Sequence, residues 1–166
     1  MKASDPSARF LLAGGSPEQV AAARQQVERL GVADTVFFAG QRAPEEIPAF
    51  LDAAAVLASP RSTGTNTPLK IYQYLRSGRP IVATRLLTHT QVLDDEVAVL
   101  TAPTPEAFAE GILAVTRDAA KAVELGARAR LLAETKYSYE AYLGKTRVAC
   151  ARLAEARGSQ VAGDVA

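Results

Sequence analysis

Residues 56–84 of this 166-residue chain read VLASPRSTGTNTPLKIYQYLRSGRPIVAT, and this pattern indicates how the whole chain folds. The apolar run at residues 56–58 predicts a short strand. A helix is expected over residues 68–76, and residues 80–84 form the next apolar run. A strand, a crossover helix and a second strand make one unit of a parallel sheet, so an α/β fold is predicted.

The same alternation continues on both sides of this stretch. Further strands are predicted at residues 9–13, 36–39 and 97–100, and helices at residues 16–30, 44–54 and, as two or three segments, 105–156. Because crossovers between parallel strands are right-handed, we expect a Rossmann-like open parallel sheet of about five strands flanked by helices. Residues 1–157 are assigned to this one domain, and residues 158–166 are predicted to be a disordered or frayed tail.

Composition limits the partners and the compartment. A net charge of +1 argues against a nucleic-acid partner, and no run approaches the about 18 apolar residues of a membrane span, so any membrane contact is peripheral. The chain has one cysteine, which excludes an intramolecular disulfide and favours a reducing, cytoplasmic compartment. The single histidine, His89, is expected at the surface, and without a second ligand cluster no metal or other cofactor is predicted.

The loop after the strand at residues 56–58 gives the strongest sign of a binding site. It ends in Thr67 and Pro68, a favourable helix start in which a hydroxyl caps the helix and proline fits its first position. A helix start after a parallel strand offers free N–H groups and a partial positive charge, to which Arg61 and Lys70 would add full charges. These features predict a diphosphate site, although a well-capped surface loop with a solvated lysine fits the spacing equally well.

Two other loops follow predicted strands at the same edge of the sheet, where open α/β folds bind ligands. Gly14-Gly15 is not the Gly-x-Gly-x-x-Gly fingerprint of dinucleotide sites, so a plain tight turn is the alternative to a ligand contact. Gly40-Gln41-Arg42 offers backbone groups that could read the edge of a base, with Arg42 stacked on it, or it forms only a turn.

Residues 56–60 and 66–84 resemble the donor-site stretch of the glycosyltransferase group 1 (GT4-like) family. In that family an "advxxxPS" strand leads through a loop to a "PLKxxEYxxxGxPVVAT" helix and strand. Supporting similarities lie at residues 10–15 ("xLxxxGxG"), 36–40 ("VxFxG"), 105–113 ("pexlAxai") and 137–139 ("fSw"). The resemblance covers about residues 9–155.

The resemblance implies the C-terminal, donor-binding half of a GT-B fold, acting in a retaining, metal-independent glycosyltransferase. The ligand would be a nucleotide-diphosphate sugar, with Lys70 and Arg61 assisting departure of the diphosphate. The residues expected to bind the donor are Gly14, Gly15, Gly40, Gln41, Arg42, Gly64, Thr65, Asn66, Thr67, Pro68, Leu69 and Gln73.

The chain departs from the family pattern in two ways. The family's pair of glutamates falls on Thr65 and Gln73, and Gln73 would grip the ribose without charge, losing on the order of 1 kcal/mol. The acceptor-binding N-terminal domain and the first strand of the donor domain, with its Arg/Lys pair, have no counterpart here, so we expect donor binding without catalysis by this chain alone. The alternatives are a non-catalytic nucleotide-binding or interaction module, a subunit of a split transferase, and a GT-B-like epimerase.

Overall fold

The computed structural model describes the backbone of residues 5–163 and the side chains of residues 5–154. The strands are β1 (Phe10–Ala13), β2 (Val36–Gly40), β3 (Leu57–Ser59), β4 (Ile81–Thr84) and β5 (Val99–Thr101). The helices are α1 (Pro17–Arg29), α2 (Ile47–Ala53), α3 (Lys70–Ser77), α4 (Leu87–Thr90), α5 (Pro105–Thr116), α6 (Ala119–Lys136) and α7 (Tyr139–Gly163), with short 3-10 helices at Ala33–Thr35 and Pro44–Glu46. Each predicted strand is present, shifted by two residues at most.

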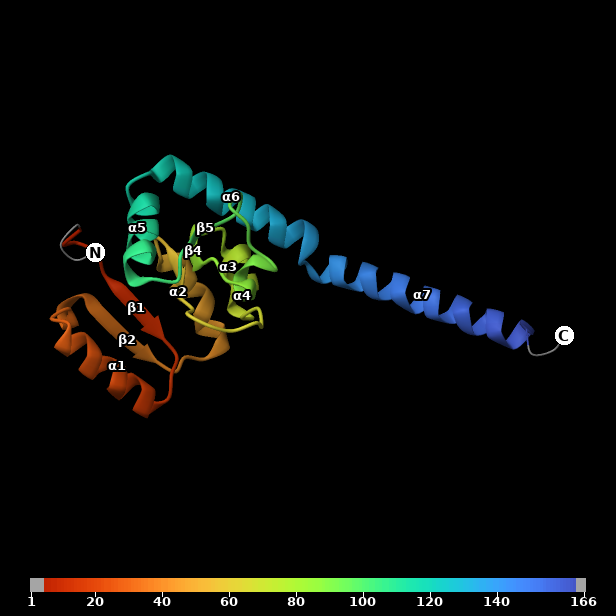
Figure 1. Ribbon diagram of the computed structural model, residues 1–166, viewed down its shortest axis with the longest axis horizontal. Coiled ribbons are helices and arrows are strands. Elements are labelled where there is room, and N and C mark those ends of the chain that lie inside the picture. Colours follow the sequence, from red (N-terminus) through yellow and green to blue (C-terminus); the bar gives the residue numbers. More distant parts are fainter. Residues whose placement is uncertain (1–4, 164–166) are drawn as a thin grey trace.

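All strand pairs are parallel, which confirms the predicted α/β class. The strands form two hydrogen-bonded groups rather than one continuous sheet: β1 pairs with β2, and β3-β4-β5 form a second group. In Figure 1, β1, β2 and α1 stand together, apart from β4, β5 and the helices around them. The expected single open sheet is therefore interrupted, because no described backbone hydrogen bond joins β1 to β3.

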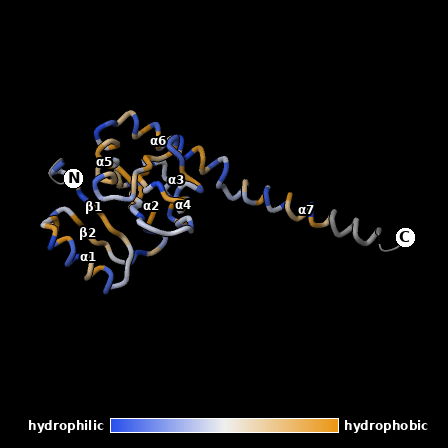
Figure 2. Tube along the Cα trace, in the orientation of Figure 1, coloured by the Kyte–Doolittle hydropathy of each residue, from blue (hydrophilic) through white to orange (hydrophobic). Residues whose placement is uncertain are grey.

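The core surrounds β4, all four residues of which are buried, as expected for a central strand of a parallel sheet. On one face, Ile71 and Leu75 of α3 pack with Ala129 and Ala133 of α6. On the other face, α5 supplies Phe108, Ile112 and Val115, which pack on Val82. Figure 2 shows these apolar stretches gathered in the body of the molecule, from which α7 projects. The second half of the chain thus provides a rigid base for the loops that follow β3 and β4.

Local signals in the sequence account for several helix ends. Ser16 and Gln19 form a reciprocal capping box at the start of α1, and Thr104 and Asp118 accept hydrogen bonds from the first turns of α5 and α6. Gly78 ends α3 in the left-handed region, with φ of +70°, which glycine adopts without strain.

The predicted tail at residues 158–166 overlaps the end of α7, which continues as a helix to Gly163. Residues 164–166 lie outside the described part of the chain, and fraying of this segment stays a prediction. Within residues 5–163, no helix combines the length and the apolar character that crossing a membrane requires.

Candidate functional site

The loop between β3 and α3 differs at its end from the prediction. α3 begins at Lys70 and has no side-chain cap, so the expected start at Pro68 and the capping role of Thr67 are wrong. The carbonyls of Pro68 and Leu69 accept tight 3-10-type hydrogen bonds from the amides of Ile71 and Tyr72, at 2.9 and 3.2 Å. The Thr67 hydroxyl lies 3.5 Å from the side-chain oxygen of Gln91. The hydroxyl thus contacts a side chain that follows β4 and accepts no hydrogen bond from the first turn of α3.

Side chains that follow β4 hold this loop by its carbonyl oxygens. The amide group of Gln91 donates to the Thr65 carbonyl at 2.7 Å, and the Thr88 hydroxyl donates to the Asn66 carbonyl. Arg61 also donates to the Asn66 carbonyl, at 3.3 Å, and to the Thr88 hydroxyl, at 3.3 Å. Because a trans peptide directs its N–H opposite to its C=O, these bonds turn the amides of the next residues the other way.

Several backbone amides of this segment have no partner within the described part of the chain. They belong to Asn66, Thr67, Leu69 and Lys70. The last two open α3, where unpaired N–H groups carry the positive end of the helix dipole. Unpaired N–H groups at the start of a helix favour the binding of anions in general.

Two positive side chains lie beside these amides. The ammonium of Lys70 is 5.5 Å from the ring centroid of Tyr74. Partial burial, and then the positive charge of Arg61, lower the pKa of Lys70, although the residue as a whole is exposed to solvent. Among the described residues no carboxylate pairs with Arg61 or Lys70. Two mutually repelling cations without a counter-ion favour a bound anion, which would also raise the lysine pKa again.

His89 does not lie at the surface as expected: its side chain is fully buried beneath the loop. Its Nδ1 lies 2.8 Å from the Thr84 carbonyl oxygen, and its Nε2 lies 2.9 Å from the Ser59 hydroxyl. A carbonyl only accepts, so Nδ1 carries the proton and Nε2 accepts from the serine. The imidazole thus links the ends of β3 and β4, and both of its nitrogens are satisfied, which explains why burial is tolerated.

The buried imidazole predicts how stability depends on pH. Burial lowers the pKa of His89; the Thr84 carbonyl opposes this shift, and the charges of Lys70 and Arg61 add to it. The unfolded chain therefore binds a proton below pH of about 6.5 that the folded chain resists, so stability falls as pH drops. We expect unfolding free energy to decline by up to about 1.4 kcal/mol per pH unit between about pH 6.5 and 5, and to be flat above pH 7.

Urea unfolding at pH 5.0, 6.0, 7.0 and 8.0 measures this dependence. The His89→Gln variant keeps a donor and an acceptor but does not titrate, and it should flatten the curve between pH 5 and 7. An equal slope in both proteins would show that His89 is not the group responsible.

The loops after β1 and β2 lie against each other. The Gly14 amide donates to the Gly40 carbonyl at 2.7 Å, and Gly14, Gly15 and Gly40 all have positive φ. Arg42 donates to the Ala39 carbonyl at 2.9 Å and lies 3.7 Å from the carboxylate of Glu46. These residues form a second group, and no described hydrogen bond or ion pair joins it to the loop that precedes α3.

The remaining predicted residues are exposed on or near α3. Gln73 lies on the helix surface one turn beyond Lys70, and Thr65 is exposed in the loop. Gly64 has φ of +120°, and a Cβ there would lie 3.1 Å from Arg61 Nη1, so glycine leaves room for the guanidinium. Sequence reasoning missed Ser59, Thr84, Thr88 and Gln91 as parts of the site. A signal was available for Ser59 and Thr84, because each is a polar residue that ends an apolar run, at residues 56–59 and 81–84.

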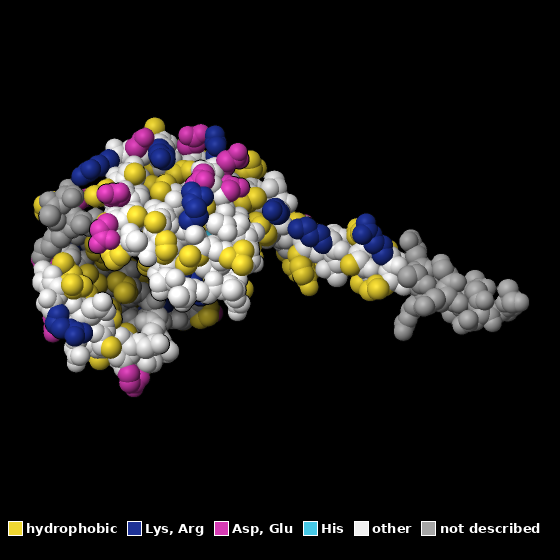
Figure 3. Space-filling model, viewed as in Figure 1, with side chains coloured by type: hydrophobic (Ala, Val, Ile, Leu, Met, Phe, Trp, Pro, Cys, Tyr) yellow, Lys and Arg dark blue, Asp and Glu magenta, His cyan; other side chains and the backbone are white. Residues whose placement is uncertain are grey.

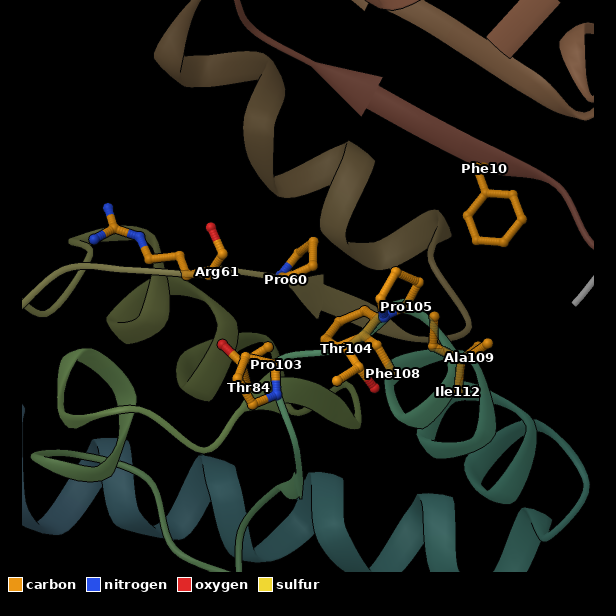
Figure 4. Close-up of a pocket in the computed structure, with 11 residues that line it drawn as sticks. Phe10, Pro60, Arg61, Thr84, Pro103, Thr104, Pro105, Phe108, Ala109 and Ile112 are labelled. Atoms are coloured by element: carbon orange, nitrogen blue, oxygen red, sulfur yellow. The ribbon is translucent and has the colours of Figure 1, made fainter. Parts of the chain in front are cut away.

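A cavity of about 450 Å³ opens next to the start of this loop. Figure 4 shows Phe10 of β1 on one side of it and Pro60 on the other, with Pro105, Phe108 and Ile112 of α5 along the wall. The Arg61 side chain extends away from Phe10, on the far side of Pro60. The lining is mostly apolar, but Arg61 also belongs to it, so this space adjoins the surface formed by the amides and the two cations.

Comparison with known proteins gives a family and a fold. The family model described as glycosyl transferases group 1 matches residues 1–118. No curated protein sequence matches the chain. Among solved structures, Alr3699/HepE of Anabaena in complex with UDP is 22% identical, with a TM-score of 0.76 over 90% of this chain and 42% of that one.

Two further solved structures have a similar fold. Sucrose-phosphate synthase from Thermosynechococcus elongatus is 24% identical, with a TM-score of 0.79 over 93% of this chain and 40% of that one. The C-terminal domain of the glycosyl transferase group 1 family protein LpcC from Francisella tularensis is 19% identical, with a TM-score of 0.70 over 83% and 74%. The chain spans about two fifths of the length of HepE and of the synthase. At these identities the likeness shows the fold: a Rossmann-like half of a GT-B structure.

Proposed function

Because the chain belongs to the glycosyl transferases group 1 family, we propose that it is the donor-binding half of a retaining, metal-independent glycosyltransferase. One observation carries this proposal: in and just before the start of α3 lie four backbone amides without a partner among the described residues, together with Arg61 and Lys70, which have no carboxylate partner there. This arrangement suits the diphosphate of a nucleotide sugar. The HepE structure contains UDP, which supports a nucleoside diphosphate as the ligand.

In the proposed reaction the positive groups act on the leaving group. Negative charge grows on the diphosphate as its bond to the sugar breaks. Fixed N–H groups and cations next to it stabilise that charge without reorganising. Lys70 and Arg61 would supply the charge that a divalent metal supplies elsewhere. The buried Ser59–His89–Thr84 linkage would hold β3 and β4 in place, so that the loop keeps this geometry.

The other predicted residues have roles in the same proposal. Thr65 and the segment 66–69 would lie against the diphosphate and the sugar, and Gln73 would accept a hydrogen bond from a ribose hydroxyl. Gly14, Gly15, Gly40, Gln41 and Arg42 would lie along the nucleoside. Acceptor-binding residues would come from polypeptide that is not part of these 166 residues, in keeping with the share of HepE and the synthase that the chain spans.

Calorimetric titration of the folded chain with UDP, GDP and ADP tests the proposed ligand. We expect weak but saturable binding of at least one diphosphate, and a weaker response to the matching monophosphate, because the second phosphate meets the amides of α3. The preferred diphosphate identifies the base. Absence of heat for all three, with the fold verified by circular dichroism, would favour an interaction module instead.

Catalysis by this chain alone is a separate prediction. With UDP-glucose or GDP-mannose and a simple sugar acceptor, we expect no transfer above the uncatalysed rate, because in this proposal the acceptor-binding residues come from polypeptide outside these 166 residues. Chromatography of the reaction mixture, which detects the nucleoside diphosphate that is released, measures the transfer. Turnover would show that the described residues already contain a complete active site. It would also contradict the second candidate, a non-catalytic module, which the replacement of two family glutamates by Thr65 and Gln73 favours.

A further inference from the structure

The side chain of Arg61 is held in the loop before α3 through one nitrogen of its guanidinium. Its Nη1 donates to the Asn66 carbonyl and to the Thr88 hydroxyl, each at 3.3 Å. The Thr88 hydroxyl in turn donates to the same Asn66 carbonyl. The three groups therefore close a small ring of hydrogen bonds, in which the hydroxyl both donates and accepts, as its chemistry allows.

The residues around this ring leave little freedom for Nη1. Gly64 has φ of +120°, and a Cβ there would lie only 3.1 Å from Nη1, so a larger residue would press on the guanidinium. Thr88 is fully buried. It is also the neighbour of His89, whose imidazole links the ends of β3 and β4. The position of the Thr88 hydroxyl is therefore set by the core of the protein and not by the exposed loop.

The other two nitrogens of the guanidinium are left for a ligand. Among the side chains that the structure describes, those of residues 5–154, none bonds to Nε or Nη2 of Arg61, and no described carbonyl does so. The N–H groups of Nε and Nη2 lie side by side on one edge of the planar guanidinium, a fork that matches two oxygens of one phosphate. Figure 4 shows the side chain extended away from Phe10 and the apolar wall of the cavity.

The positive charge around this fork is local. On the face seen in Figure 3, basic and acidic side chains are mixed over the body of the molecule, and the chain has a net charge of only +1, so a broad positive field is not what would select an anion. Burial and, after it, the charge of Arg61 lower the pKa of Lys70, which places the two cations near each other. A phosphate on the fork would therefore also meet Lys70 and the amides at the start of α3.

We infer that Thr88 is a positioning residue of the proposed diphosphate site: its hydroxyl fixes Nη1 of Arg61, so that the Nε–Nη2 edge meets a phosphate as a pre-formed fork. The inference rests on the proposed function, and it gives Arg61 a geometric role in addition to its charge. Without the hydroxyl the guanidinium is freer to rotate, and ordering it again on binding costs entropy. A lysine at position 61 would keep the charge but would have no fork.

Titration of the full chain with UDP, GDP and ADP, followed by NMR chemical shifts, measures affinity even where binding is weak. For the diphosphate that the wild type prefers, we expect Thr88→Val, which has nearly the same shape but no hydroxyl, to weaken binding about fivefold. This change corresponds to about 1 kcal/mol, the contribution of one neutral hydrogen bond. Thr88→Ser keeps the hydroxyl and should bind within about twofold of the wild type. Arg61→Lys should bind about tenfold more weakly, because the bidentate contact is lost.

A double-mutant cycle shows whether Thr88 acts through Arg61. In the Arg61→Ala background, Thr88→Val should have almost no further effect on affinity, because the group that it positions is gone. In the Lys70→Ala background, Thr88→Val should still weaken binding about fivefold, because the lysine does not bond to the threonine.

Thr35→Val is the control for the loss of a buried hydroxyl. Thr35 is buried just before β2, where its hydroxyl donates to the Val32 carbonyl at 2.8 Å, and strand β2 separates it in the chain from the loops that follow. This variant should lower stability and leave the affinity unchanged. If Thr88→Val does not fold, Gly64→Ala presses on Nη1 from the exposed loop instead, and its effect should also disappear in the Arg61→Ala background.

The possible failures separate the inference from the proposed function. Equal affinity of the wild type and folded Thr88→Val, or of the wild type and Arg61→Lys, would overturn the inference and leave the diphosphate site in place. An equal loss from Thr88→Val with and without Arg61, or an equal loss in Thr35→Val, would overturn it as well, since the hydroxyl would then act only on the loop or on stability. If the folded wild type binds none of the three diphosphates, the proposed function fails, and the inference fails with it.

Discussion

Replacing Lys70 by alanine is expected to weaken binding of the preferred nucleoside diphosphate by about 10- to 100-fold, because a charge-assisted contact to phosphate contributes about 1.5–3 kcal/mol. The lysine lies at the first position of α3, where its charge adds to that of the free amides. Calorimetry of both proteins with the same nucleotide measures the loss. Affinity for the nucleoside without phosphates should not change, since the lysine is expected to contact only the diphosphate.

The matched control is Lys121→Ala. Lys121 is exposed on α6, and the variant removes the same charge from the chain without touching the loop. Its affinity should equal that of the wild type. If both variants lose affinity equally, the effect is one of net charge, and the site does not lie at α3. Higher salt should also reduce the difference between Lys70→Ala and the wild type if the contact is electrostatic.

The second large effect is on stability. Gly126 of α6 lies against the end of α3, and a Cβ at this position would overlap the carbonyl oxygen of Gly78 and lie 3.0 Å from its carbonyl carbon. Both atoms belong to the backbone, so neither can rotate away as the end of a flexible side chain could. We expect Gly126→Ala to reduce the free energy of unfolding by about 3 kcal/mol, which corresponds to a fall in Tm of about 6–12 °C. Thermal and urea unfolding measure it.

Gly144→Ala is the control for helix propensity. Gly144 lies in α7, and a Cβ there meets nothing within 4 Å. Alanine should leave stability unchanged or raise it by about 0.5–1 kcal/mol, because it lowers the entropy lost on helix formation. A loss of stability in both variants would point to a general cost of alanine and against a close contact at Gly126.

The fold was predictable because its signals are local. Apolar runs bounded by glycine and proline marked the five strands, and Ser16, Thr104 and Asp118 cap helices as their side chains allow. The division into two groups of strands was not predictable, since periodicity reports which residues form strands and not which strands pair. Whether β1 meets β3 depends on packing between residues far apart in the sequence.

The candidate site shows the same limit. The loop before α3, with Arg61 and Lys70, was singled out from its charges and from an expected cap at Thr67 that does not form, and its role in binding a diphosphate stays a prediction. The start of α3 was placed two residues early, and the contact of Thr67 with Gln91, 24 positions later, could not be read from the local pattern. The burial of His89 depends on Ser59, thirty positions earlier in the chain. No local pattern could show that a lone histidine would find both an acceptor and a donor inside the protein.

The contact between α3 and α6 has a consequence for the proposed nucleotide site. The carboxyl end of α3 is fixed by the fit of Gly126 against Gly78 and by the hydrogen bond of 2.7 Å from Arg130 to the Ser77 carbonyl. The helix has eight residues, so its two ends are only about 12 Å apart. A tilt imposed at the carboxyl end of α3 would move its amino end, and Lys70 with it. Surface changes on α6 would therefore retune affinity for a ligand that they never touch.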